Sequence, residues 1–209
     1  IMNRLLYLIC ILSSFFISSC SLSEKKVDKS VLIIEKFNLN HYSKSGSKLY
    51  MLETPYSVFN QTDQSYLLYK TNIKFFEKEN IKYNVNSDSA KLLNNKFLEL
   101  KGNVEINDFK NNKTIIKSNN LFWVIDKSEF ILEGNVSLVN NIINLSSSKA
   151  SFDKKEDIIM FYKPIKYNYK DEDGIRKYNI SSENAYYNIS TKDVIFKSKN
   201  DKVKSKLVF

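Results

Sequence analysis

Few side chains in this sequence are of the kinds that perform catalysis or hold a metal ion. The 209 residues include one histidine, His41, and two cysteines, Cys10 and Cys20. A catalytic triad or a zinc site needs several such groups in one place, so we expect His41 to be a surface residue near the first strand. An acidic run at 171–173 precedes Gly174, which is typical of a solvated hairpin turn. We therefore expect neither an enzyme nor a metal site, and no cofactor.

Cys20 is the residue at which we expect chemistry, and that chemistry is a modification of the chain itself. A polar, positive start (Asn3 and Arg4) is followed by an apolar run over 5–17 and by Ser18-Ser19-Cys20. The run is shorter than the ~20 apolar residues of a spanning helix. The end of the run resembles a bacterial lipobox, in which the cysteine thiol is acylated. We predict a lipoprotein signal peptide over 1–19 and a polar tether over 20–30, which begins with lipidated Cys20. A secretory signal with a chance cysteine, or a short retained anchor, is the alternative.

Composition limits the class of protein and its partners. Hydrophobic residues make up 43% of the chain and aromatic residues 13%, which is enough for a sizeable core. The net charge of +9 would suit nucleic acid, but all basic residues except Arg4 and Arg176 are lysines. Nucleic-acid readers favour the bidentate guanidinium of arginine, and no basic cluster here alternates with aromatic residues. We expect no nucleic-acid partner.

The body of the chain is a repeat of β-hairpins. Apolar residues alternate with polar ones from Val31 onward, and no stretch sustains a helical period. Four copies of a repeat have an apolar residue that is followed by serine two positions later and by alanine or leucine five positions later, and they start at Val85, Ile116, Leu145 and Ile180. Each copy contains a polar turn, at 94–96, 126–128, 153–157 and 191–193. The prediction is an all-β fold, with a bend or bulge at Gly102-Asn103 and Gly134-Asn135 and an interruption at Lys163-Pro164.

Alternation also predicts which side chains line the interior. Residues of the same parity in each strand form one apolar face, and stacking the hairpins joins these faces into a continuous surface. We expect the following residues to line it: Leu98, Leu100, Val104, Ile106, Trp123, Phe130, Leu132, Val136, Leu138, Phe152, Ile159, Phe161, Ile165 and Phe196. This surface is either an open trough that binds acyl chains or a closed, dry core.

Two phrases point to a known family. Leu100-Lys101-Gly102-Asn103-Val104-Glu105-Ile106 and Leu132-Glu133-Gly134-Asn135-Val136-Ser137-Leu138 lie in repeated hairpins behind a membrane-anchoring N-terminus. They resemble the LptC and OstA-like proteins of lipopolysaccharide export, and the stretch from Phe37 to Leu52 looks like the start of LptC. The resemblance covers roughly residues 31–209. It implies an open, twisted β-jellyroll over these residues.

The resemblance also implies a function and partners. Such a protein receives lipopolysaccharide or a related glycolipid in an apolar trough from an inner-membrane ABC transporter. It then passes the lipid to an OstA-like periplasmic bridge, and we expect the two proteins to pair through an edge strand near the C-terminus. Lys101, Lys117 and Lys163 are candidates to meet lipid phosphates. The lipobox departs from the family pattern, in which a transmembrane helix stands there. An LptA-type soluble bridge and a structural or adhesive β-repeat lipoprotein of the outer membrane remain as alternatives.

Overall fold

The computed structural model describes residues 31–108, 115–140, 143–164, 166–171, 174–199 and 203–208. The predicted signal peptide, Cys20, the tether and Ile165 lie outside the described residues. Within these ranges, none of the chain forms a helix that is long and apolar enough to cross a membrane.

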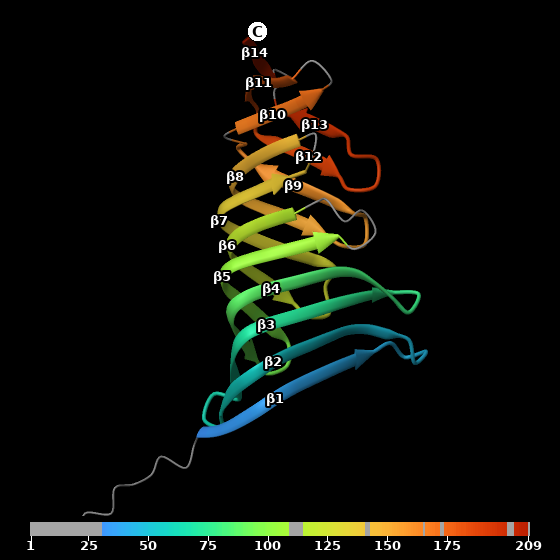
Figure 1. Ribbon diagram of the computed structural model, residues 1–209, viewed down its shortest axis with the longest axis vertical. Coiled ribbons are helices and arrows are strands. Elements are labelled where there is room, and N and C mark those ends of the chain that lie inside the picture. The colour runs from blue at the N-terminus through green and yellow to red at the C-terminus, as the bar shows by residue number, and fades with distance from the viewer. Residues whose placement is uncertain are drawn as a thin grey trace, which may run out of the picture.

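The described residues form one antiparallel sheet, as the alternation predicted. Strands adjacent in sequence pair in the order β1 to β8, and the path continues through β10, β11 and β14, while β9, β12 and β13 form a side branch (Figure 1). The bounds are β1 Val31–Tyr42, β2 Lys48–Asn60, β3 Ser65–Glu77, β4 Asn80–Leu93, β5 Phe97–Asp108, β6 Ile115–Val124, β7 Glu129–Val139, β8 Ile143–Asp153, β9 Ile158–Tyr162, β10 Lys166–Asp171, β11 Gly174–Ser181, β12 Asn184–Asn188, β13 Val194–Lys197 and β14 Lys204–Val208. The molecule is elongated, with β1 at one end of the long axis and β14 at the other (Figure 1).

Three of the repeated serines lie at the level where the long strands bend. The strand register shifts between Asn86 and Ser89 in β4, and at matching levels of β5, β6 and β7. In all four copies the serine hydroxyl donates to the backbone carbonyl two residues on: Ser87 to Ser89, Ser118 to Asn120, Ser147 to Lys149 and, between β11 and β12, Ser182 to Asn184. A bulge leaves a backbone group outside the sheet ladder, so the hydroxyl supplies the missing partner. The serine of the sequence repeat is therefore part of the bend.

Two glycines allow the closest approach of neighbouring strands at this bend. Gly102 has a φ of 74° and Gly134 a φ of 75°, a region that L side chains rarely adopt. A Cβ atom at Gly102 would lie 2.5 Å from Asp88 Oδ2, and one at Gly134 would lie 2.9 Å from Asn119 Nδ2. The bulge predicted at these positions is confirmed by the register shifts of β5 and β7.

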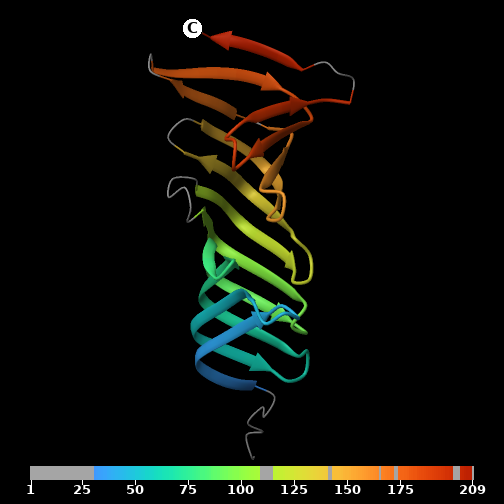
Figure 2. The same cartoon turned by 90° about the vertical axis from the view of Figure 1, so that its right-hand side faces the viewer.

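The bends fold the sheet into two layers that face each other across an interior. Aromatic rings of strands that do not pair come into contact: Tyr50 of β2 lies 5.1 Å from Trp123 of β6, and Tyr83 of β4 lies 5.2 Å from Phe152 of β8, between ring centroids. Figure 2 shows the bent strands wrapping around the long axis. The bend thus divides each long strand into two halves, one in each layer. The apolar face of both halves points into the interior.

A row of hairpin turns forms one rim of the folded sheet. Successive turns are joined by single backbone hydrogen bonds, from Asn94 N to Gln64 O, Ile125 N to Lys96 O, Lys154 N to Ser128 O and Ile189 N to Asp157 O, with lengths of 3.2, 2.9, 3.1 and 2.9 Å. These are the turns that the sequence predicted, extended by the earlier turn near Gln64. We call this row the turn rim.

The C-terminal part departs from the regular stack. Two short strands, β9 and β10, pair with different parts of β8, because the chain leaves the sheet after Tyr162 and re-enters it at Lys166. Lys163 has a φ of 45° at this break, which confirms the interruption predicted at Lys163-Pro164. Among the described strands, β1 pairs only with β2, β13 only with β12 and β14 only with β11. The sheet is therefore open, with an edge at each end.

Candidate lipid-binding interior and its lateral mouth

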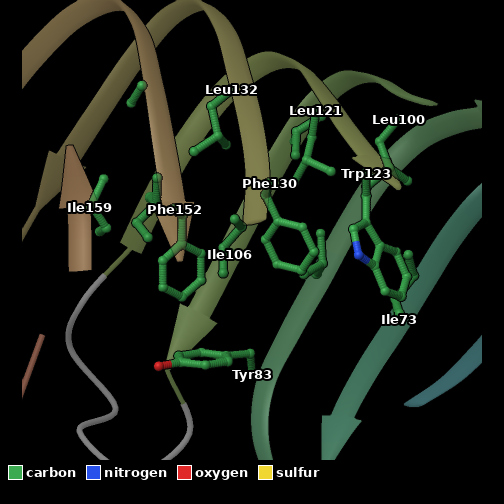
Figure 3. Close-up of a cluster of buried hydrophobic side chains, with 14 of the residues drawn as sticks. Ile73, Tyr83, Leu100, Ile106, Leu121, Trp123, Phe130, Leu132, Phe152 and Ile159 are labelled. Atoms are coloured by element: carbon green, nitrogen blue, oxygen red, sulfur yellow. The ribbon is translucent and has the colours of Figure 1, made fainter. Parts of the chain in front are cut away.

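The structure brings the predicted interior residues into one hydrophobic cluster. Twelve of them are at most 3% exposed: Leu98, Leu100, Val104, Ile106, Trp123, Phe130, Leu132, Val136, Leu138, Phe152, Ile159 and Phe161. Phe196 is half-buried and packs against the cluster. Figure 3 shows Phe130, Phe152 and Tyr83 pointing into the same space. The cluster extends along the sheet from Tyr50 in β2 to Ile189 after β12.

Side chains fill this interior at its aromatic centre. Phe75 of β3 lies 5.1 Å from Trp123 and 5.3 Å from Phe130, and Phe130 lies 5.7 Å from Phe152, measured between ring centroids. The layers therefore touch through their own aromatic residues. Strand pairing does not join them: the partners of β2, β3 and β4 are neighbours in the chain order. Separating the layers at the rim would break side-chain contacts and leave the sheet ladders intact.

A cavity of about 430 Å³ lies at the rim, between the two layers. One wall comes from β1 to β4 and includes Tyr50, Phe75 and Tyr83, and the other comes from the end of β6, with Trp123, and from the turn rim, with Lys154. We call this cavity the lateral mouth. Four lysines (Lys82, Lys127, Lys154 and Lys155) and two carboxylates (Glu77 and Asp126) line it. Burial, together with the Asp126 carboxylate, raises the pKa of the Tyr50 hydroxyl.

Lys154 places its ammonium group over the aromatic floor of the lateral mouth. Lys154 Nζ lies 4.4 Å from the ring centroid of Trp123, 4.9 Å from that of Phe75 and 5.2 Å from that of Phe130. Within the described ranges, no carboxylate forms an ion pair with it at 4 Å or less. Burial lowers the pKa of Lys154 to about 8, although the Asp153 carboxylate opposes this change. The cation is thus held by π faces, at a cost in solvation.

Two side-chain contacts close the rim beside the lateral mouth. The Tyr83 hydroxyl donates to Asp157 Oδ1 at 2.6 Å, and Lys82 Nζ pairs with the same oxygen at 2.8 Å. Burial, followed by the bond to Asp157, raises the pKa of Tyr83 far above its usual range. Burial lowers the pKa of Lys82, but hydrogen bonds to Asp157 and Glu77 outweigh it and leave that pKa raised. Further along, Asn140 Nδ2 donates to the Tyr187 hydroxyl at 3.1 Å.

Of the mouth residues, the sequence predicted Trp123 as part of the interior but not Tyr50, Phe75, Tyr83 or Lys154. Tyr83 stands between Lys82 and Asn84, but Tyr50 stands between Leu49 and Met51 and Phe75 is followed by Phe76, so alternation alone does not give the inward side of these two strands. Lys154 lies in the polar turn at 153–157, which the sequence predicts only as a connection between two strands. Two of the lysines predicted to meet lipid phosphates lie away from the mouth, on the outer face. There Lys101 pairs with Glu99 at 2.9 Å and Lys117 pairs with Glu105 at 2.6 Å.

Two further observations concern His41, which also lines the lateral mouth, and metal binding. His41 is exposed on β1 and stacks on Tyr50 at 4.9 Å, which agrees with the surface position predicted for it. In the described part of the chain, no three histidine, cysteine, aspartate or glutamate side chains gather in a way that could hold a metal ion.

Fold and interior together define a β-jellyroll with a continuous apolar interior, a lateral mouth and open edges. This class can hold an apolar ligand between its layers, as a lipid carrier does. The family model described as "Lipopolysaccharide-assembly, LptC-related" matches residues 5–138, which is more than half of the chain. The chain therefore belongs to the LptC-related lipopolysaccharide-assembly family, as the repeated Gly-Asn-Val phrases indicated.

A solved structure is also similar to part of the chain. It is the crystal structure of LptH from Pseudomonas aeruginosa, described as the LptA homologous periplasmic component of the conserved lipopolysaccharide transport device. The alignment has 10% sequence identity and a TM-score of 0.45, and it covers 59% of this chain and 93% of that one. No curated protein shows significant similarity to the chain.

Proposed function

We propose that this protein is a periplasmic lipid-transfer component of lipopolysaccharide export, which takes acyl chains into the interior between its two layers. The role is binding and transfer, without catalysis. Each buried CH₂ group would contribute ~0.8 kcal/mol, so a lipid with several chains could be held without a specific polar site. The interior residues predicted from the sequence, from Leu98 to Phe196, are the proposed contacts.

The observation that supports this function best is the way the interior is closed. The apolar cluster is continuous along the sheet, yet the rim between the layers is held by side chains such as Tyr83 and Asp157 and by aromatic contacts. Sheet hydrogen bonds are costly to break, whereas side chains can change rotamer in ps to ns when exposed and somewhat more slowly when packed. The bends at Gly102 and Gly134 would then act as the hinges of opening.

The proposed partners follow from the family and from the open edges. Lipopolysaccharide would arrive from an inner-membrane ABC transporter and leave to an OstA-like bridge. An edge strand offers unpaired N–H and C=O groups, so pairing of β14 with a strand of the bridge would continue the interior from one protein into the next. Lipidated Cys20 would hold the protein at the inner membrane. An LptA-type bridge has the same requirements for an interior and for edges.

A second candidate is a structural or adhesive β-repeat lipoprotein with a permanently closed core. The burial of the interior favours it, since Leu132, Val136, Phe152 and Phe161 are 0% exposed and the aromatic centre is filled. In that case the apolar residues would serve stability alone.

Lipid extracted with the gently purified full-length protein separates the two candidates. The lipid carrier should bring a glycolipid out of the cell, and the Phe130→Glu variant should bring none, because a charge in the interior disfavours acyl chains. Lys117→Glu, on the outer face, is the control for charge change and should retain the lipid. A folded wild-type protein that carries no glycolipid, in repeated mild preparations, would favour the structural candidate and contradict transfer.

A further inference from the structure

The lateral mouth combines an aromatic floor with an excess of positive charge. Lys82 is already neutralised by Glu77 and Asp157, at 3.1 and 2.8 Å. In contrast, Lys127, Lys154 and Lys155 line the same cavity, and no described carboxylate lies within 4 Å of their ammonium groups. The cavity therefore contains cations that could accept an anionic partner, directly above an apolar interior.

Lys154 occupies the place where an apolar chain would enter. Its ammonium group lies over Trp123, Phe75 and Phe130, and the rings of Trp123 and Phe130 belong to the buried cluster, at 3% and 1% exposure. The lysine covers these rings from the mouth side. A cation held over rings in a partly desolvated site is stabilised by the negative face of the rings. The burial of a few CH₂ groups of an acyl chain on the same rings would replace that stabilisation.

A phosphate group is the partner that suits the displaced ammonium. Charge-assisted hydrogen bonds between ammonium and phosphate are stronger than contacts to a π face in an exposed setting. Lys154 lies on the turn between β8 and β9, next to exposed Lys155, so its side chain can turn from the floor to the rim without movement of a strand. Lys127, on the neighbouring turn, is also exposed.

We propose that the lateral mouth is a binding site for the phosphate group of an anionic lipid, in which Lys154 leaves the rings of Phe75, Trp123 and Phe130 to pair with the phosphate. An acyl chain of the same lipid takes the place of the ammonium group on these rings. Lys155 and Lys127 complete the phosphate site at the rim. This inference rests on the proposed lipid-binding function and assigns the part of the site that recognises the headgroup.

The sequence supplies its own probe for this site, because Trp123 is the single tryptophan of the chain. Its emission in the purified full-length protein reports on what lies over the ring. We would titrate the protein with dodecyl phosphate below its micelle concentration, with uncharged dodecyl maltoside, and with inorganic phosphate. Dodecyl phosphate should shift the emission to shorter wavelength and saturate, whereas inorganic phosphate should leave it unchanged at the same concentration.

Variants then assign the effect to Lys154. Lys154→Met keeps an apolar stem over the rings and should bind dodecyl phosphate at least about tenfold more weakly. Lys154→Arg keeps the charge and should remain within about threefold of the wild type. Lys117→Met removes an exposed lysine of the outer face and should change nothing. Dodecyl maltoside should bind Lys154→Met at least as tightly as the wild type, because it has no phosphate to pair with Lys154 and no ammonium has to leave the rings of the variant. This result would show that the Met variant is folded and keeps its apolar site.

Equal affinity of Lys154→Met and wild type for dodecyl phosphate would overturn the inference. A shift by inorganic phosphate equal to that by the lipid would also overturn it, since the anion would then bind without an acyl chain. Neither result depends on whether glycolipid is extracted from cells with the wild type, so a failure of this site is distinguishable from a failure of the proposed function.

Discussion

Substitution of Gly102 by alanine tests whether the close approach of the Asp88 side chain at the bend limits this position to glycine. A non-glycine residue at the φ of 74° costs about 1–2 kcal/mol in backbone strain. The new Cβ atom would also meet Asp88 Oδ2 at 2.5 Å and Asp88 Cβ at 3.1 Å, so the Asp88 side chain must turn away. Asp88 Oδ2 accepts a hydrogen bond from Asn103 Nδ2 at 2.7 Å, and because both side chains are exposed, losing it costs roughly 0.5–1.5 kcal/mol more.

We therefore expect Gly102→Ala to lower the free energy of unfolding by about 1.5–3.5 kcal/mol. The matched control is Gly46→Ala: Gly46 has a φ of 88°, but no atom lies within 4 Å of the place of its Cβ. It should show the backbone strain alone, about 1–2 kcal/mol. In the Asp88→Ala background the obstructing carboxylate is absent and only the Cβ atom of residue 88, 3.1 Å away, remains, so Gly102→Ala should cost less there than in the wild type.

Urea unfolding of the purified full-length protein, followed by Trp123 emission, measures these differences. The slope of the transition should stay constant, because the same surface is exposed. Equal losses for Gly46→Ala and Gly102→Ala would show that the approach of Asp88 does not matter. A loss in the Asp88→Ala background as large as in the wild type would lead to the same conclusion.

Three further predictions concern the mouth and the C-terminal edge. The pKa of Lys154, lowered to about 8, means that the unfolded protein binds more protons between pH 8 and 10.5. The free energy of unfolding of the wild type should therefore rise with pH in this window by up to roughly 3 kcal/mol relative to that of Lys154→Met. If the free energies of unfolding of the two proteins change with pH in parallel, the prediction is wrong. Tyr83→Phe removes one hydrogen bond to Asp157 and should lower the free energy of unfolding by about 1–3 kcal/mol. It should also accelerate dodecyl phosphate binding, measured by stopped flow, whereas the control Tyr69→Phe, at an exposed ring, should change neither. Deletion of 203–209, which removes β14, should leave the protein at the membrane and abolish pull-down of an OstA-like bridge, and retained binding by the folded truncation would move the contact to the β1 edge.

The fold was predictable because the repeat and the alternation are local features. The parity of Leu98, Leu100, Val104 and Ile106 determines which side chains point inward, whatever the neighbouring strands are. The Gly-Asn pairs marked the bend at the right position, whereas the role of the repeated serine in the bend became visible only in the structure. The division of the C-terminal strands followed from Lys163-Pro164, since proline cannot donate to a ladder.

The lateral mouth was not predictable, because it depends on how far the sheet folds back on itself. Tyr83 and Asp157 are 74 positions apart, and neither has an unusual neighbourhood in the sequence. The same holds for Lys154 and Phe75. Alternation left the choice between a trough and a filled core open, since it gives the direction of a side chain but not the distance between layers.

Site-specific photo-cross-linking in cells tests the central claim most directly. A photoreactive phenylalanine analogue at Phe130 would lie in the interior, where the native side chain is 1% exposed, and one at Tyr69 would lie on the outer face, where the native side chain is 43% exposed. We predict that the protein labelled at position 130 captures lipopolysaccharide and that the protein labelled at 69 does not. Folded, expressed protein that captures none from position 130, or equal amounts from both positions, would contradict transport through the interior.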